Sequence, residues 1–301
     1  MVGRFAPSPS GRMHLGNVFS ALLAWLSVRA QNGTMLLRIE DLDPQRSRRE
    51  YAQGIKDDLK WLGLDWDVET PWQSRRSDIY AQQFARLQQT GLVYPCFCTR
   101  NELHDASAPH AGDGTVLYSG RCRTLTAEQQ ARQTRKPAWR LQVPDGEMGY
   151  RDGLQGEYFQ NLAKECGDFI IRRSDGVYAY QLAVVTDDAL MGVTEVVRGD
   201  DLRSSTPRQL YLYQLLGFTP PKFYHVPLLV APDGRRLSKR DRDLDLGALQ
   251  KTHTPEQIIG TLAFAAGLQD KNQPISAREL VPRFSWQRVR QCSTLPIEKF
   301  L

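Results

Sequence analysis

The chain has 301 residues, of which 41% are hydrophobic and 24% charged, as in ordinary soluble folded proteins. Its formal net charge of +5 permits a nucleic-acid partner without demanding one. The longest apolar stretch, residues 18–28, is too short to span a bilayer, and no basic-then-apolar leader precedes it, so we expect a cytoplasmic protein with no membrane partner. The five cysteines are irregularly spaced, which disfavours a disulfide framework and favours a metal site.

Residues 1–91 alternate between predicted strands and helices, which indicates an α/β fold with a parallel sheet and right-handed crossovers. The predicted elements are a strand at 2–6, a mostly buried helix at 16–31, a buried strand at 34–40, and a second helix with Tyr51, Ile55, Leu59 and Leu62 on one face. We expect the second helix to begin with a capping box at residues 47–50 (SRRE).

The alternation is interrupted at residues 92–170, where short strand-like runs and turns predict an inserted subdomain. It resumes in residues 171–240, which we interpret as the second half of the same domain. There, Pro207 in the first turn and Gly217 just past the end define a helix over residues 204–217. Residues 241–301 are predicted to be helical, with a helix that starts at residues 254–256 and stops at Gly267.

The first predicted strand is followed by a loop, residues 7–11 (PSPSG), that leads into residues 14–17 (HLGN) at a helix start. A helix N-terminus offers unpaired N–H groups and the positive end of a dipole, which suit a triphosphate. Gly16 would let the nucleotide approach the backbone, and His14 would donate to phosphate oxygens as charge develops. The alternative is a simple turn in which His14 is only a polar residue at a helix start.

A basic run, residues 235–240 (RRLSKR), follows the turn signal at residues 232–234 (PDG). Ser238 and Lys239 on a flexible loop would close over a pyrophosphate leaving group, with Lys239 as a compact cation. The alternative is a solvated basic loop with no ligand.

Taken together, HLGN and RLSKR resemble the paired nucleotide-binding motifs of class I aminoacyl-tRNA synthetases. Four further segments resemble the glutamyl-tRNA synthetase branch: residues 4–11 (RFAPSPSG), 37–44 (LRIEDLDP), 180–188 (YQLAVVTDD) and 196–202 (VVRGDDL). The resemblance extends from residue 2 to about residue 240. It implies a Rossmann-like nucleotide-binding domain that activates L-glutamate with ATP and Mg²⁺. It also implies five ATP-binding residues: His14, Gly16, Asn17, Ser238 and Lys239. Of these, His14 and Lys239 are expected to be catalytic.

A glutamate site should offer two cations and one anion, because glutamate has two carboxylates and one ammonium group. Arg4 and Arg198 are predicted to bind the carboxylates through bidentate guanidinium contacts, and Glu40 the ammonium; which arginine binds which carboxylate is left open. The arginine opposite the side-chain carboxylate would disfavour glutamine, whose neutral amide cannot compensate a buried charge. The resemblance adds Ala6, Ser8 and Tyr180 to this site.

Three cysteines of the inserted subdomain, Cys96, Cys98 and Cys122, suit three thiolate ligands of one structural zinc ion. Ligand chemistry alone favours His104 or His110 as the fourth ligand. The resemblance instead implies Tyr118, in a Y-x-x-x-C pattern, and this is our prediction. The alternative is a group of buried apolar cysteines without a metal.

Few residues follow Lys239, whereas the enzymes that charge tRNA(Glu) continue into a helical anticodon-binding domain. The resemblance therefore implies the branch that transfers glutamate to the queuosine base in the anticodon of tRNA(Asp), and we expect a monomer without an anticodon-binding domain. Leu42, where tRNA(Glu) enzymes usually carry Thr, and Asn17, in place of the last His of the motif, fit an altered acceptor. The alternatives are a compact glutamyl-tRNA synthetase that charges the 3′ end of tRNA(Glu) and a catalytically idle RNA-binding paralogue.

Overall fold

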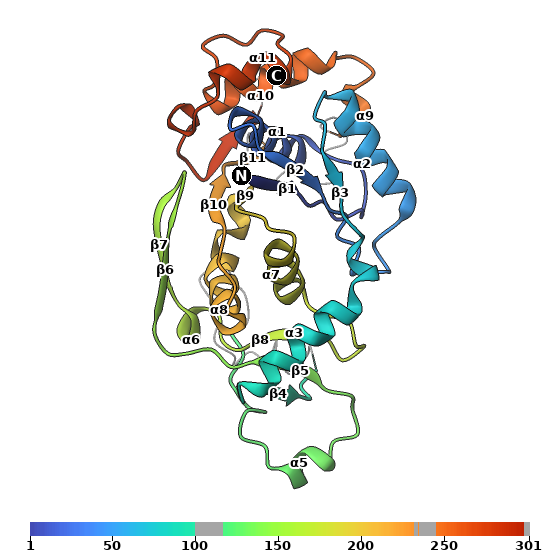
Figure 1. The fold of residues 1–301 in the computed structure, drawn as a ribbon, viewed down its shortest axis with the longest axis vertical. Helices are drawn as coiled ribbons and strands as arrows, with labels where there is room; N and C mark the ends of the chain where they lie inside the picture. The colour runs from blue at the N-terminus through green and yellow to red at the C-terminus, as the bar shows by residue number, and fades with distance from the viewer. Residues whose placement is uncertain (100–116, 232–233, 235–244, 298–301) are drawn as a thin grey trace.

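Figure 1 shows the computed structural model of the chain, which describes residues 1–99, 117–231, 234 and 245–297. Its centre is a parallel sheet of five strands in the order β10-β9-β1-β2-β3. The strands are β1 (Val2–Phe5), β2 (Thr34–Leu37), β3 (Val68–Glu69), β9 (Glu195–Gly199) and β10 (Lys222–Val226). The chain moves outward from β1 to β3 and returns to the other side of β1 with β9. Parallel sheets bind ligands beyond the carboxyl ends of their strands at such a reversal point.

Five helices pack against this sheet or against one another (Figure 1). They are α1 (Leu15–Ala30), α2 (Arg49–Trp61), α3 (Ser77–Gln89), α7 (Tyr180–Leu190) and α8 (Thr206–Leu216), with 3-10 turns at Gln73–Arg75 and Asp200–Ser205. Helix α1 is buried on most of its surface because it packs between the sheet and the C-terminal region. Helices α3, α7 and α8 share a second apolar core with the inserted segment. The parallel α/β domain predicted from the sequence is confirmed.

The start of α2 differs from the prediction. The helix begins at Arg49 with Arg48 as its N-cap, and no side chain caps it, so the capping box expected at residues 47–50 was wrong. The reason is a preceding turn in which Ser47 N donates to Asp43 O at 2.9 Å. Arg48 N in turn donates to Pro9 O at 2.9 Å, which ties the helix start to the first loop. By contrast, α8 has Pro207 in its first turn and ends at Gly217 with a φ of 66°, as predicted.

The inserted segment is antiparallel. Its three-stranded sheet consists of β4 (Val93–Cys96), β5 (Ala138–Leu141) and β8 (Phe169–Arg172). A separate hairpin consists of β6 (Glu147–Asp152) and β7 (Gly156–Asn161). The described residues of the inserted segment also include two short helices, α5 (Ala127–Ala131) and α6 (Leu162–Glu165). In Figure 1 the three-stranded sheet lies at the end of the molecule far from the C-terminus, and the hairpin runs along its side towards β10.

The C-terminal region packs over α1 at the opposite end (Figure 1). It contains α9 (Leu246–Leu249), α10 (Pro255–Ala266), α11 (Ala277–Leu280) and 3-10 turns at Val281–Arg283 and Trp286–Arg288. Thr254 caps α10 and Gly267 ends it with a φ of 87°, as predicted. The strand β12 (Thr294–Pro296), which pairs in parallel with β11 (Leu228–Val230), was not predicted. No helix in the described part of the chain has the length and apolar character needed to cross a bilayer.

Candidate active site

A cavity of about 680 Å³ lies where β1, β2 and β9 end. It is lined by every residue predicted to bind glutamate and by the three described residues predicted to bind ATP: Arg4, Ala6, Ser8, Glu40, Tyr180, Arg198, His14, Gly16 and Asn17. Segments far apart in the sequence therefore meet in one place. Ser238 and Lys239 lie outside the described residues, and the individual roles of all these residues stay predictions.

The two arginines predicted to bind carboxylates are buried, and protein groups hydrogen-bond to both of them. Arg4 Nε lies 3.3 Å from Asp188 Oδ1, and its Nη1 donates to the carbonyl oxygen of Val197 at 3.3 Å. Arg198 Nε donates to His225 Nε2 at 3.0 Å, and its Nη2 donates to a threonine hydroxyl. Both guanidinium groups thus have a fixed direction before any ligand arrives.

A third buried arginine, Arg38, links the carboxylates of this site. Its Nη1 lies 2.6 Å from Asp188 Oδ1 and its Nη2 lies 3.0 Å from Glu40 Oε1. Burial alone would raise the pKa of Asp188, but Arg38 and Arg4 outweigh it and the pKa is lowered. Burial raises the pKa of Glu40 despite the same two arginines, so its charge is incompletely compensated. A buried carboxylate in this condition is well suited to accept a ligand ammonium group.

A second group of polar side chains fixes the C-terminal half of α7 against α3 and the 3-10 turn that precedes it. Asp187 accepts from Arg76 Nε at 2.7 Å, from Tyr80 Oη at 2.9 Å and from Gln73 Nε2 at 2.9 Å. Asp187 is adjacent to the carboxylate that pairs with Arg38. This network therefore fixes the position of Asp188, and with it the contacts of Asp188 to Arg4 and Arg38.

The sequence interpretation missed the polar partners of both arginines. Arg38 and Asp188 lie inside segments that were quoted for their resemblance, yet no role was assigned to them. His225 carried no signal, because it is a lone histidine outside every element predicted from the sequence. It is buried on β10 directly beside Arg198, its register partner on β9, and its Nδ1 lies 2.6 Å from Asp152 Oδ2. Burial lowers the pKa of His225 to about 4, so the imidazole is neutral near neutral pH.

The other end of the cavity is the N-terminus of α1. His14 is its N-cap: Nδ1 accepts from Gly16 N at 3.1 Å, and Asn17 Oδ1 accepts from His14 N at 3.2 Å. Because Nδ1 accepts a hydrogen bond, the neutral imidazole carries its proton on Nε2. A Cβ at position 16 would lie 3.1 Å from two atoms of the imidazole, which explains the glycine there. Asn17, replacing a motif histidine, serves as part of this cap.

A larger cavity of about 1150 Å³ adjoins the first and shares Ser8, Ser10, Glu40 and Tyr180 with it. Leu42 also lines it. Its basic lining residues come from both the parallel domain and the inserted segment: Arg46, Arg135, Lys136, Arg140 and Arg173. Asp43 and Asp175 also line it, so the basic side chains are in excess there.

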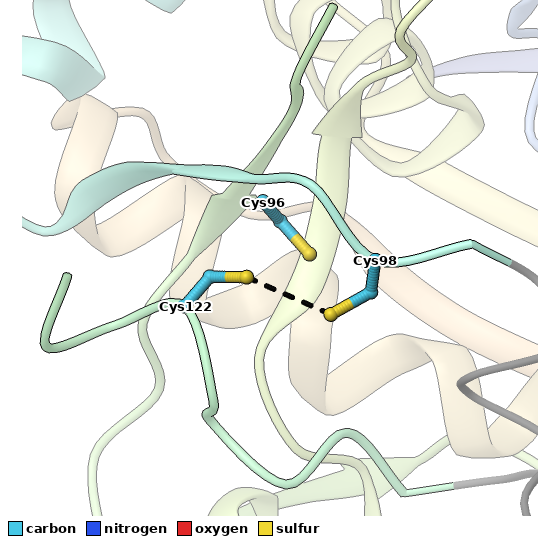
Figure 2. Close-up of side chains that lie close together, drawn as sticks. All are labelled: Cys96, Cys98 and Cys122. Carbon is cyan, nitrogen blue, oxygen red and sulfur yellow. Dashed lines mark hydrogen bonds between the residues drawn. The ribbon is translucent and has the colours of Figure 1, made fainter. Parts of the chain in front are cut away.

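The three predicted thiolate ligands meet at the far end of the inserted segment, where their sulfurs point towards one another (Figure 2). All three Sγ atoms lie within 4.8 Å of one another, and those of Cys98 and Cys122 are 3.6 Å apart. Tetrahedral zinc with thiolate bonds of about 2.3 Å requires sulfurs about 3.8 Å apart, so the donor set fits. The Tyr118 hydroxyl lies beside them and accepts from Cys122 N at 2.7 Å.

Arg140 flanks this cysteine cluster. Its Nε donates to Cys96 Sγ at 3.3 Å, and its guanidinium lies 3.9 Å from the ring centroid of Tyr118. The other two candidates for a fourth metal ligand, His104 and His110, lie outside the described residues.

Comparison with known proteins identifies the family. The model of the class I tRNA synthetases (E and Q), catalytic domain, matches residues 1–296. A relative from Nitratidesulfovibrio vulgaris named glutamyl-Q tRNA(Asp) synthetase is 51% identical, over 93% of this chain and 90% of its own length. The chain belongs to the class I tRNA synthetases (E and Q), among the glutamyl-Q tRNA(Asp) synthetases. A second relative of this synthetase with the same name, from Symbiobacterium thermophilum, is 46% identical over 99% of this chain and 97% of its own length.

Solved structures agree with the fold of the synthetase. Glutamate-tRNA synthetase from Elizabethkingia anophelis matches with a TM-score of 0.85 at 28% identity, over 98% of this chain and 67% of that one. A glutamate tRNA ligase from Elizabethkingia meningosepticum, solved in complex with its amino acid, matches with a TM-score of 0.84 over 98% of this chain and 66% of that one. The Rossmann-like architecture expected from the resemblance is confirmed.

Proposed function

We propose that this synthetase activates L-glutamate with ATP and transfers it to the queuosine base in the anticodon of tRNA(Asp). Two observations support the proposal. Relatives named for this reaction match over 90% and 97% of their own lengths, and the charges expected of a glutamate site line one cavity. The cavity supports the proposed activation step, and the names of the relatives support the proposed acceptor.

Charge balance favours glutamate as the amino acid. At and directly behind the buried end of the cavity are three guanidinium groups, from Arg4, Arg38 and Arg198, and two carboxylates, from Glu40 and Asp188. A third carboxylate near Arg38, that of Asp187, is balanced by Arg76. With the carboxylates ionised this set has one uncompensated positive charge. Bound glutamate, with a net charge of −1, would neutralise it, whereas glutamine would leave it buried and unpaired.

In the activation step, an oxygen of the glutamate α-carboxylate attacks the α-phosphorus of ATP and pyrophosphate leaves. Glu40 would hold the ammonium group, and His14 Nε2 would donate to a phosphate oxygen as negative charge builds there. Ser238 and Lys239 are assigned to the leaving pyrophosphate. In the described part of the chain, the cysteine cluster is the only group of three or more potential metal ligands. Mg²⁺, which neutralises phosphate charge when bound, would enter the site together with ATP.

In the transfer step, one hydroxyl of queuosine's cyclopentene diol attacks the glutamyl carbonyl, and AMP leaves. The terminal ribose of a tRNA also presents a cis-diol, so the same adenylate is chemically competent for both acceptors. The adjoining cavity favours a nucleic-acid acceptor, since its basic side chains can contact backbone phosphates beside the glutamate site.

We further propose that Cys96, Cys98, Cys122 and Tyr118 hold one structural zinc ion, which would fix the turn that carries these residues at the end of the inserted segment. The protein would act as a monomer in the cytoplasm, where ATP and mature tRNA occur.

The test is transfer of radiolabelled glutamate to tRNA from queuosine-replete and queuosine-deficient cells, followed by nuclease mapping. The proposal requires label only in replete tRNA and only in the anticodon fragment of tRNA(Asp). Label at the 3′ end of tRNA(Glu) from both sources would make the protein a compact glutamyl-tRNA synthetase instead. If the protein shows no transfer and no glutamate-dependent pyrophosphate exchange, only the alternative of an RNA-binding protein remains.

A further inference from the structure

A chain of buried hydrogen bonds extends behind Arg198 into the β6–β7 hairpin. Asp152, at the end of β6, lies 2.6 Å from His225 Nδ1, and His225 Nε2 accepts from Arg198 Nε at 3.0 Å. The side chains of Asp152 and His225 are completely buried. Neither has been given a part in binding glutamate or ATP. The chain nevertheless ends on a guanidinium that lines the glutamate cavity.

The direction of each hydrogen bond in this chain is fixed by the arginine. A guanidinium N–H can only donate, so His225 Nε2 must be the unprotonated nitrogen. The single proton of the neutral imidazole then lies on Nδ1, where it requires an acceptor. Asp152 Oδ2 supplies that acceptor. The carboxylate therefore selects the only tautomer of His225 that can hold Arg198.

Backbone groups fix the carboxylate in turn. Asp152 Oδ1 accepts from Leu154 N at 3.0 Å, from Gln155 N at 2.9 Å and from His225 N at 3.2 Å. These three donors leave Oδ2 for the imidazole. They also make the two carboxylate oxygens of Asp152 inequivalent, because any side chain that replaces it must place an acceptor at the Oδ1 position.

Arg198 is held at a second point by α8 and the turn before it. Its Nη2 donates to Thr206 Oγ1 at 2.8 Å and to Leu202 O at 3.4 Å. With Nε on His225, these bonds occupy two of the three nitrogens. Among the described residues none accepts a hydrogen bond from Nη1, which remains for a ligand carboxylate.

We propose that Asp152 and His225 are positioning residues of the glutamate site, which orient Arg198 by fixing the imidazole tautomer. This inference rests on the proposed function, because it assumes that Arg198 binds a carboxylate of glutamate. It also gives the inserted hairpin a direct connection to amino-acid recognition, through residues that never touch the substrate.

The decisive variant is Asp152→Asn. Three backbone donors require the amide oxygen at the Oδ1 position, so the amide NH₂ must face His225 Nδ1. The imidazole would then accept a hydrogen bond at Nδ1 and carry its proton on Nε2. Nε2–H and the N–H of Arg198 would face each other as two donors, and the hydrogen bond between them would be lost. Loss of a hydrogen bond to a charged group should raise the KM for glutamate about tenfold to a hundredfold in pyrophosphate exchange. The KM for ATP should remain within about twofold, because His14 and the α1 N-terminus are untouched.

A pair of substitutions at the histidine separates tautomer control from simple disruption. The amide oxygen of His225→Gln reaches the Nε2 position and accepts from Arg198, so its KM for glutamate should stay close to that of the unmodified protein. The amide of His225→Asn is too short to reach Arg198, and its KM for glutamate should rise as in Asp152→Asn. Adding Asp152→Asn to His225→Gln should raise KM little further, since no imidazole tautomer remains to be set.

Asp145→Asn is the matched control, because it makes the same change at an exposed position of the inserted segment. An unchanged KM for glutamate in Asp152→Asn, or equal effects of Gln and Asn at position 225, would overturn the inference. If Asp152→Asn fails to fold, the comparison of the two His225 variants still decides. Absence of glutamate-dependent exchange in the unmodified protein would instead refute the proposed function, so the two failures are distinguishable.

Discussion

The two ends of the active-site cavity are built in different ways. At the glutamate end, Arg4, Arg198 and Glu40 are at most 9% exposed, and each is bonded to other buried polar side chains. At the phosphate end, His14 is half-buried and Asn17 is exposed, and the pattern there is the N-terminal cap of one helix.

The difference follows from what each end must recognise. A triphosphate carries a large charge and binds to any well-directed set of N–H groups, so one helix terminus is sufficient. Glutamate and glutamine differ by one charge, and discrimination between them requires cations that are fixed and desolvated in advance. Substitutions at the glutamate end should therefore change both stability and amino-acid recognition, whereas those at the phosphate end should change ATP binding alone.

The largest effect is expected from Asp188→Asn. The substitution removes the charge that compensates Arg38 and Arg4, and leaving buried cations unpaired should lower the free energy of unfolding by about 3–5 kcal/mol. Urea denaturation measures this difference. Asp57→Asn, the same change on the exposed face of α2, should alter it by less than about 0.5 kcal/mol. Equal midpoints for the two variants would show that the buried network does not support the fold.

A smaller effect is expected from pH. The buried imidazole of His225 faces Asp152, Arg198 and Tyr150, with Arg203 farther away, and its pKa is lowered to about 4. An unfolded histidine has a pKa of about 6.5, so the unfolded state binds the proton first as pH falls. Stability should therefore be complete above pH of about 6.5 and decline by up to about 3 kcal/mol towards pH of about 4.

Urea midpoints across this pH range test the pH prediction. The pKa of Asp152 is lowered by His225 and backbone N–H groups against the effect of burial, so this carboxylate should extend the decline below pH of about 4. In His225→Gln the decline should be shallower than in the unmodified protein, because the histidine contribution is gone. An identical slope would contradict a neutral, buried His225.

The smallest effect is expected at the phosphate end, from Gly16→Ala. The added methyl would lie 3.1 Å from the His14 imidazole and displace its cap, which should raise the KM for ATP about tenfold and leave the KM for glutamate within about twofold. Gly54→Ala is the control, since a Cβ there meets no atom within 4 Å and alanine favours the helix. A shift in the KM for glutamate of similar size would contradict the separation of the two ends.

Local signals in the sequence predicted the local parts of the structure. Pro207 and Gly217 defined α8, and Thr254 and Gly267 defined α10, because capping and backbone preferences act over a few residues. The cysteines were found for a similar reason, since a metal cluster needs a distinctive residue type. The resemblance located the cavity residues, which no local pattern would have brought together.

The partners of those residues could not be predicted. Asp152 and His225 are 73 positions apart, and neither stands in a pattern typical of a site. Arg38 follows a buried strand. From sequence alone, a charged side chain at such a position is expected to be exposed, because its distant carboxylate partner is not known. The strand β12 was missed because three residues ending in proline carry too little periodicity. Long-range polar contacts, in short, depend on topology that the local pattern does not contain.

The most direct test of the account is pyrophosphate exchange with ATP and either glutamate or glutamine, with no RNA added. A cavity with one uncompensated buried cation should support exchange with glutamate, and kcat/KM for glutamine should be at least about a hundredfold lower. Comparable exchange with glutamine would contradict the charge balance assigned to Arg4, Arg38, Arg198, Glu40 and Asp188. Absence of exchange with either amino acid would contradict the assignment of the cavity to glutamate activation.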